Sequence, residues 1–228
     1  MEQLAEFISD SLFGLANKSE ARRMKKELET DAFFYGVRTI ERRNMLKTAL
    51  KRYPITTKEE FKYVVRRLFN GYSQEEHYCS IDIAEAYSEF HSPDMLSLYE
   101  EMLSLSHAAD SVDPIASRLI GPLIYTHPEL EEHVEHWIRS TNVWLNRTAI
   151  MLHFHRKKQT NIKLLVSTIN QLFYHNDYVV QFAIGKVLRE YSKFNGDWVM
   201  NYISDHPRLN NVSRREALRH LKKGQIIL

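Results

Sequence analysis

Apolar residues recur along this chain at the spacing of a single helix face. The clearest stretch carries apolar side chains at Phe61, Val64, Val65, Leu68 and Phe69. These positions follow the i, i+3, i+4, i+7, i+8 pattern, which predicts a helix with one buried stripe. Thr57 stands three residues ahead of Glu60, which is the spacing of a capping box, so we expect the helix to begin there.

Comparable helix starts follow along the rest of the chain. They fall near Pro93, Asp110, Pro128, Asn142, Asn161, Asp177, Gly196 and Ser213. The chain holds only 7 glycines and 6 prolines in 228 residues, too few for the frequent turns of a β-sandwich or barrel. These observations predict an all-α protein.

The helix starts also repeat. Residues 140–150 can be overlaid on residues 175–185 with an offset of 35, and weaker echoes appear at 110–116 and 213–218. One helical hairpin occupies about 33–36 residues in solenoid proteins, so this period predicts an α-solenoid. We expect about six stacked HEAT-like hairpins in one domain over residues 1–228, although another antiparallel helical array would give similar echoes.

Charge is divided into three blocks. Residues 1–72 carry 15 basic and 10 acidic groups. Residues 73–136 carry one basic and 14 acidic groups, and residues 137–228 carry 15 basic and 5 acidic groups. The net charges are therefore +5, −13 and +10. This segregation favours a concave basic face for a polyanion, while solvated helix surfaces are the alternative explanation.

Known catalytic motifs are missing from the sequence. It has no P-loop, GxGxxG, HExxH, GxSxG or CxxC motif, and His133 with His136 fits a helix surface better than a metal site. We predict neither a cofactor nor a metal. The chain has a single cysteine and starts without a basic or apolar leader, which favours a cytoplasmic protein, and we expect a monomer. No apolar run approaches 18 residues, so we expect no membrane span.

Two residues one repeat apart are candidates for chemistry. Asp113 and Arg147 are separated by 34 positions. Residues one repeat apart lie side by side in a solenoid, so we expect a carboxylate next to a guanidinium. The alternative is that Asp110 caps a helix and Asp113 is an acidic residue at its third position, favoured by the helix dipole.

Five markers in order make the sequence resemble the AlkD-type DNA alkylation repair proteins, which are HEAT-like repeat DNA glycosylases. The markers are residues 34–42, 110–113, 144–149, 183–191 and 213–217. The resemblance covers nearly the whole chain. It implies a right-handed α-solenoid whose concave basic face holds duplex DNA, and active relatives excise 3-methyladenine and 7-methylguanine. The family's carboxylate corresponds to Asp113 and its backbone-contacting arginine to Arg147.

The sequence departs from the family pattern at three positions. Ala109 and Lys186 occupy the places of two tryptophans that flank the deoxyribose in relatives, and Ile40 replaces a proline. We therefore expect a degenerate paralogue with weak DNA binding and little or no excision, Asp113 being a vestigial catalytic residue. The predicted DNA-binding residues are Arg147, Lys186, Arg189, Arg38, Arg42, Arg214 and Arg215.

Two other functions are compatible with the sequence. The first is an active glycosylase that uses Tyr35, Trp144 or Phe182 in place of the missing tryptophans. The second is a helical scaffold that binds an unknown protein partner through the acidic middle block. The sequence leaves open whether residues 17–30 form a helix that contacts the duplex.

Overall fold

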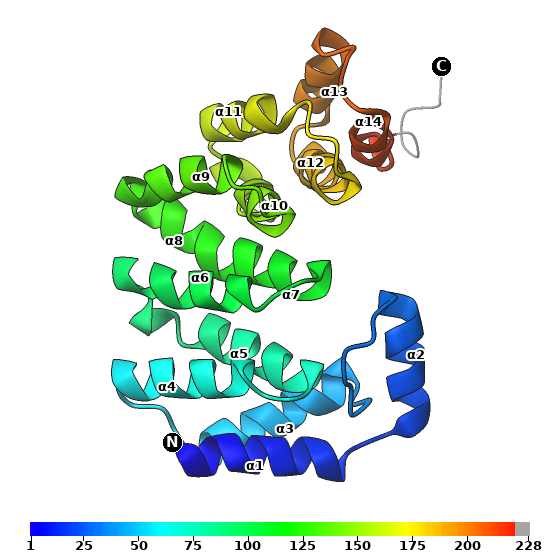
Figure 1. Ribbon diagram of the computed structural model, residues 1–228. Helices are drawn as coiled ribbons and strands as arrows, with labels where there is room; N and C mark the ends of the chain where they lie inside the picture. The colour runs from blue at the N-terminus through cyan, green and yellow to red at the C-terminus, as the bar shows by residue number, and fades with distance from the viewer. Residues whose placement is uncertain (222–228) are drawn as a thin grey trace. The chain divides into compact units, whose positions relative to one another are not determined.

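The structure is a computed structural model that describes residues 1–221 (Figure 1). Within that range the regular structure is helical and no strand occurs, which confirms the predicted all-α fold. The chain divides into two compact units, Met1–Met102 and Leu103–Leu228. Among residues 1–221, none of the helices combines the length and the hydropathy needed to cross a bilayer. The organisation as one domain stays a prediction.

The first unit contains five α-helices and the start of a sixth. Its helices are α1 (Glu2–Gly14), α2 (Lys18–Leu28), α3 (Thr39–Arg52), α4 (Lys58–Phe69), α5 (Gln74–Ala86) and the start of α6 (Leu96–Ser104). The Thr57 hydroxyl accepts the N–H of Glu60 at 3.2 Å. All five apolar residues of the predicted α4 stripe are buried, and α4 packs on α5 (Figure 1), so this prediction is confirmed.

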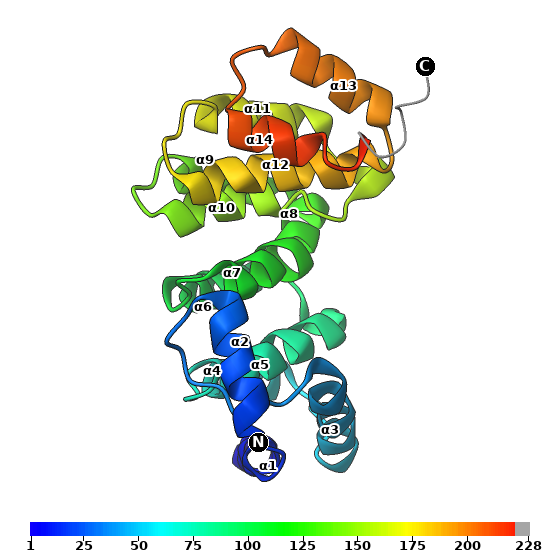
Figure 2. The same ribbon diagram turned by 90° about the vertical axis from the view of Figure 1, so that its right-hand side faces the viewer.

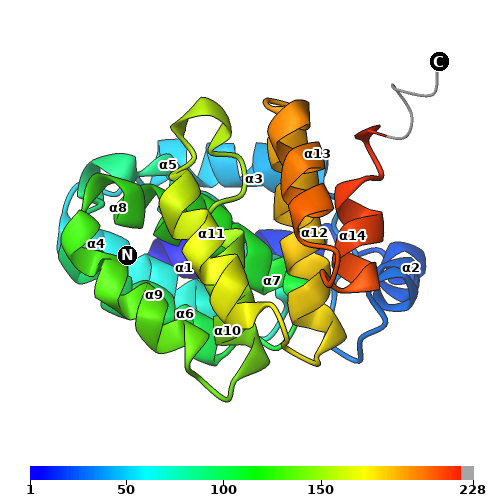
Figure 3. The ribbon, with the colours of Figure 1, turned by 90° about the horizontal axis from the view of Figure 1, so that it is seen from above.

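The second unit is built from the helices that follow α6. They are α7 (Ala109–Pro114), α8 (Gly121–Thr126), α9 (Glu131–Ile138), α10 (Val143–Met151), α11 (Ile162–Leu172), α12 (Tyr178–Ser192), α13 (Gly196–Asp205) and α14 (Asn211–Ala217). A π-helical turn, Ile115–Ile120, joins α7 to α8. Helix α12 packs against α10 and against α14, beside which it lies in Figure 3.

The 35-residue repeat is visible in the hydrogen bonds of the second unit. Asn142 caps α10 and Asp177 caps α12, each accepting the N–H two residues ahead. The buried amide of Asn146 donates to the carbonyls of Trp137, Ile138 and Ser140. The buried amide of Gln181 donates to those of Leu172, Phe173 and His175, each 35 positions further along. Both amides therefore bind the preceding inter-helix turn in the same way.

Gly185 allows α12 and α14 to approach closely. A Cβ atom placed on this residue would lie 2.7 Å from the carbonyl oxygen of Ser213. The Ser213 hydroxyl in turn donates to the carbonyl of Gln181 at 2.7 Å. The glycine of the 183–191 marker and the serine of the 213–217 marker are thus two sides of one helix contact.

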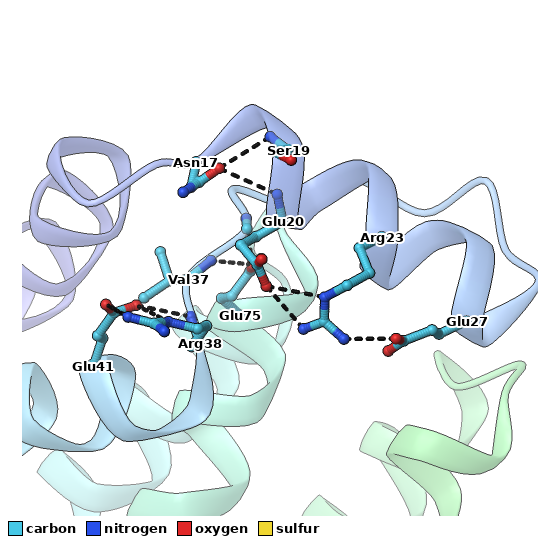
Figure 4. A network of polar contacts seen from close by, with 10 residues as sticks. Asn17, Ser19, Glu20, Arg23, Glu27, Val37, Arg38, Glu41 and Glu75 are labelled. Atoms are coloured by element: carbon cyan, nitrogen blue, oxygen red, sulfur yellow. Dashed lines mark hydrogen bonds and ion pairs between the residues drawn. The ribbon is translucent and has the colours of Figure 1, made fainter.

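Helix α2 contributes no buried residue to the first unit. It is attached through a loop in which Gly36 has φ +84°, and a Cβ there would lie 2.1 Å from the Asn17 carbonyl oxygen. The buried Glu75 carboxylate accepts the N–H groups of Tyr35, Gly36 and Val37 at 2.8–3.1 Å. Figure 4 shows this carboxylate below the start of α2, and Figure 2 shows α2 along its length. The loop, rather than a hydrophobic core, holds the helix in place.

A neutral histidine is buried in the second unit. The His153 side chain is enclosed, its Nδ1 atom lies 2.7 Å from the Tyr125 hydroxyl, and burial lowers its pKa to about 3. An unfolded histidine binds a proton below about pH 6.5 while the folded one does not, so stability should fall as the pH drops from about 6.5 towards 3. The slope attributable to this residue approaches about 1.4 kcal/mol per pH unit. Urea titrations at several pH values should show a flatter profile for His153→Gln, and identical slopes would contradict this account.

Candidate active site on the second unit

Asp113 lies inside α7 rather than at its cap. The helix begins at Ala109 with Ala108 as its N-cap, so Asp110 does not cap it and Asp113 is not its third residue. The interpretation of Asp113 as a dipole-stabilising residue of the first turn is therefore wrong. A cap needs a side chain that accepts backbone N–H groups, and the Asp113 carboxylate instead points at side chains from two other helices.

Asp113 and Arg147 form a buried bidentate ion pair. The Arg147 Nε and Nη2 atoms donate to the two carboxylate oxygens at 2.6 and 2.9 Å, and only 3% of Arg147 is exposed. Its remaining Nη1 atom donates to the carbonyl of Val179 at 2.6 Å. The planar guanidinium suits this two-bond geometry, which holds α7, α10 and the start of α12 together. The neighbours predicted from the 34-residue spacing are confirmed.

Lys186 makes a third contact with the same carboxylate. Its Nζ atom, carried on α12, lies 2.6 Å from Oδ2 of Asp113 and 5.3 Å from the centre of the Phe154 ring. Two cations therefore share one carboxylate, and the three groups together carry a charge of +1. The sequence predicted a lysine beside the site but did not predict this ion pair, which joins residues 73 positions apart.

These groups line a hollow of about 270 Å³ on the second unit. Ala109 lies on its wall, where a methyl group provides no aromatic surface. Phe154, in the turn after α10, is the aromatic residue that sequence reasoning missed. It follows the helix that carries Arg147, in a segment without a recognisable pattern. Of the proposed substitutes for tryptophan, Trp144 is absent from the lining and Phe182 lines a separate hollow with Tyr178.

The predicted DNA-binding arginines differ in how far they are available. Arg42 is buried against Asp82, with which it forms an ion pair of 2.6 Å, so like Arg147 it is an internal partner in this structure. Three others have partners within their own unit and remain partly exposed: Arg38 with Glu41, Arg189 with Glu216, and Arg214 with the carbonyl of His206. Arg215 is exposed and donates to a carbonyl of its own helix at 3.4 Å.

Residues 17–30, which the sequence left undecided, include the exposed helix α2. Lys18, Arg22 and Lys26 occupy positions i, i+4 and i+8 and therefore lie on one face. All three are exposed, and within residues 1–221 none has a carboxylate oxygen within ion-pair distance. Arg23, in contrast, is held by Glu20 and Glu27 (Figure 4). The spacing of these three cations was the signal in the sequence for this basic stripe.

No metal centre is apparent in the part of the chain that the structure describes. Over residues 1–221 no group of three or more histidine, cysteine, aspartate or glutamate side chains is placed to bind an ion. The two histidines that follow α10 both contact other side chains. The Nδ1 atom of His153 is hydrogen-bonded to the Tyr125 hydroxyl, and the Nδ1 atom of His155 lies 3.1 Å from Glu190.

Comparison with known proteins assigns the family. The profile of the family described as DNA alkylation repair enzyme matches residues 8–221. The solved structure of a predicted DNA alkylation repair enzyme from Enterococcus faecalis is 26% identical, with a TM-score of 0.81, covering 92% of this chain and 98% of that one. AlkD2 from Streptococcus mutans has the same fold, with 15% identity, a TM-score of 0.58, and 89% and 97% coverage. No curated protein sequence matches. The chain belongs to the DNA alkylation repair enzyme family.

Proposed function

We propose that this protein binds the backbone of duplex DNA weakly and releases little or no alkylated purine. The observation that carries the proposal is the state of the Asp113 carboxylate. Both of its oxygens are held by cations, Arg147 and Lys186, at 2.6–2.9 Å. Loss of a cationic purine leaves a positively charged sugar in the transition state, and a carboxylate accelerates the reaction by stabilising that charge. A group with a net charge of +1 opposes it.

The missing aromatic walls act in the same direction. Ala109 offers a methyl group, and the Lys186 position offers an ammonium instead of a ring. Each lost cation–π contact forfeits about 1–3 kcal/mol, which is one to two decades of rate. Two such losses and an added positive charge should together slow excision by about three decades or more.

A release assay tests the catalytic part of the proposal. Wild-type protein incubated with methylated duplex DNA should free 3-methyladenine and 7-methylguanine at close to the uncatalysed rate. The variant Asp113→Asn should behave in the same way, because the carboxylate contributes little to catalysis. Product is measured by chromatography against a protein-free control.

The second candidate function is an active glycosylase, and Phe154 is the observation that favours it. Its ring lines the hollow that contains Asp113 and offers one aromatic surface to a sugar. Fast release by the wild type that disappears in Asp113→Asn would select this function and reject the first one.

The basic stripe of α2 supports the binding part of the proposal. Lys18, Arg22 and Lys26 form a row of exposed cations on a helix whose residues are not needed for a core. Contacts between such cations and phosphates release counterions, so affinity should fall as salt is added. We expect Lys18→Glu/Arg22→Glu/Lys26→Glu to weaken duplex binding by about tenfold or more at low salt. The slope of log affinity against log salt should decrease by about 2–3.

A charge-matched variant provides the control for this measurement. Lys47→Glu/Lys51→Glu/Lys163→Glu changes the net charge by the same amount at exposed positions of α3 and α11. Equal losses in both variants would show that only net charge matters and that α2 is not the contact surface. Binding that is absent or independent of salt would favour the protein-scaffold function.

A further inference from the structure

Among the described residues that line the hollow of the second unit, Lys186 combines an accessible amine with a proton acceptor. A quarter of its side chain is exposed, and its Nζ atom lies 2.6 Å from Oδ2 of Asp113. The Phe154 ring lies beneath the same nitrogen. The carboxylate and the ring position the amine, and its partial exposure leaves it in reach of a ligand.

The charge balance of the site leaves this amine available for chemistry. Arg147 already neutralises Asp113 through two parallel hydrogen bonds. Burial of the carboxylate therefore does not require the ammonium of Lys186. A guanidinium keeps its proton under ordinary conditions, whereas a lysine can lose one and become a nucleophile. Of the two cations on Asp113, only Lys186 can form a covalent bond to a ligand.

We propose that Lys186 captures the aldehyde of an abasic deoxyribose as a Schiff base. The inference rests on the proposed function, in which this hollow faces the sugars of duplex DNA. An abasic site arises when a purine is lost by hydrolysis, and its C1′ carbon is then in equilibrium with an open-chain aldehyde. This substrate needs no aromatic walls, because no sugar cation has to be stabilised.

The reaction is balanced within the site. The Lys186 ammonium transfers one proton to the Asp113 carboxylate, and the free amine attacks C1′ of the aldehyde to form a carbinolamine. Asp113 returns the proton to the departing hydroxyl, which leaves as water, and a protonated imine joins Nζ to C1′. A carboxylate 2.6 Å from the amine is well placed for both transfers. No oxidant or reductant takes part.

Three other lysines of the described residues also have a carboxylate partner, but they lie outside the hollow. Lys193, the residue that follows α12, pairs with Glu190, and half of its side chain is exposed. Lys58 and Lys62 share the exposed carboxylate of Asp94. Among the residues that line the hollow, Lys186 is the single lysine in the part of the chain that the structure describes.

Reductive trapping tests the proposal. Full-length protein is incubated with a duplex that carries one natural abasic site, and cyanoborohydride converts any imine to a stable amine. Denaturing gels should show a covalent complex, and peptide mapping should place the sugar on Lys186. The variant Lys186→Arg keeps a cation beside Asp113 but cannot form an imine, so trapping should fall at least about tenfold. Lys193→Arg should trap as the wild type does.

Binding to a duplex with a tetrahydrofuran abasic analogue tests DNA binding separately from imine formation, because the analogue has no aldehyde. Two outcomes would overturn capture of the aldehyde by Lys186 while leaving DNA binding intact. In the first, the wild-type protein binds the analogue but gives no adduct with the natural abasic site. In the second, adducts persist in Lys186→Arg or map to other lysines. Failure to bind either the analogue or an undamaged duplex would overturn both. Thermal unfolding of Lys186→Arg close to that of the wild type confirms that the variant is folded.

Discussion

Replacing Arg147 by alanine should lower the free energy of unfolding by about 3–5 kcal/mol, the usual cost of breaking a buried ion pair. The guanidinium is almost fully buried and holds both oxygens of Asp113 and the carbonyl of Val179. Its removal leaves a largely buried carboxylate with Lys186 alone and a carbonyl without its donor. Urea denaturation followed by circular dichroism measures the change.

Two comparisons sharpen this prediction. Arg215→Ala removes an exposed guanidinium that donates to a carbonyl of its own helix, and it should change stability by no more than about 0.5 kcal/mol. Arg147→Lys keeps the charge but loses the bidentate geometry, so its loss should lie between the other two. If Arg147→Ala cost less than about 1 kcal/mol, the pair would not be a structural element of the second unit.

Restoring both aromatic walls should create excision activity. The double variant Ala109→Trp/Lys186→Trp removes the ammonium from Asp113 and places two rings beside the hollow. The Asp113 carboxylate then keeps only Arg147 as a cationic partner. With the ammonium gone and two cation–π surfaces added, we expect release of 3-methyladenine to rise by about tenfold or more over the wild type. Initial rates on methylated duplex DNA measure the gain.

Two further variants identify the cause of that gain. Ala109→Trp/Lys186→Met removes the ammonium without adding the second ring, so it isolates the charge from the aromatic contribution. Adding Asp113→Asn to the double tryptophan variant should abolish the new activity, because the carboxylate is then needed. An unchanged rate in the double tryptophan variant would mean that the hollow does not receive the sugar.

Local signals in the sequence were sufficient for much of the fold. The capping box and apolar stripe of α4 depend on residues within 12 positions of one another, and both are present as predicted. The 34-residue spacing was enough to place Asp113 beside Arg147, because a repeat converts distance along the chain into contact. The same logic applies to Asn146 and Gln181, whose shared role as turn-binding amides was not recognised.

Contacts outside the repeat could not be predicted in this way. The ion pair of Lys186 with Asp113 joins residues more than two repeats apart, so no period relates them. Phe154 reaches the hollow from an irregular turn. The start of α7 was misplaced because Asp110 looks like a cap, whereas the helix begins two residues earlier, with Ala108 as its N-cap and without a side-chain cap. In each case tertiary packing decides what the local sequence leaves open.

The attachment of α2 has a consequence for how this protein can evolve. The helix is held through backbone groups around Gly36 and by one carboxylate, Glu75, and none of its own side chains is fully buried. Substitutions at the exposed positions of α2 can add or remove charge at little cost to folding. Affinity for a polyanion can therefore drift independently of stability in this lineage, with selection acting on the electrostatics of a single helix.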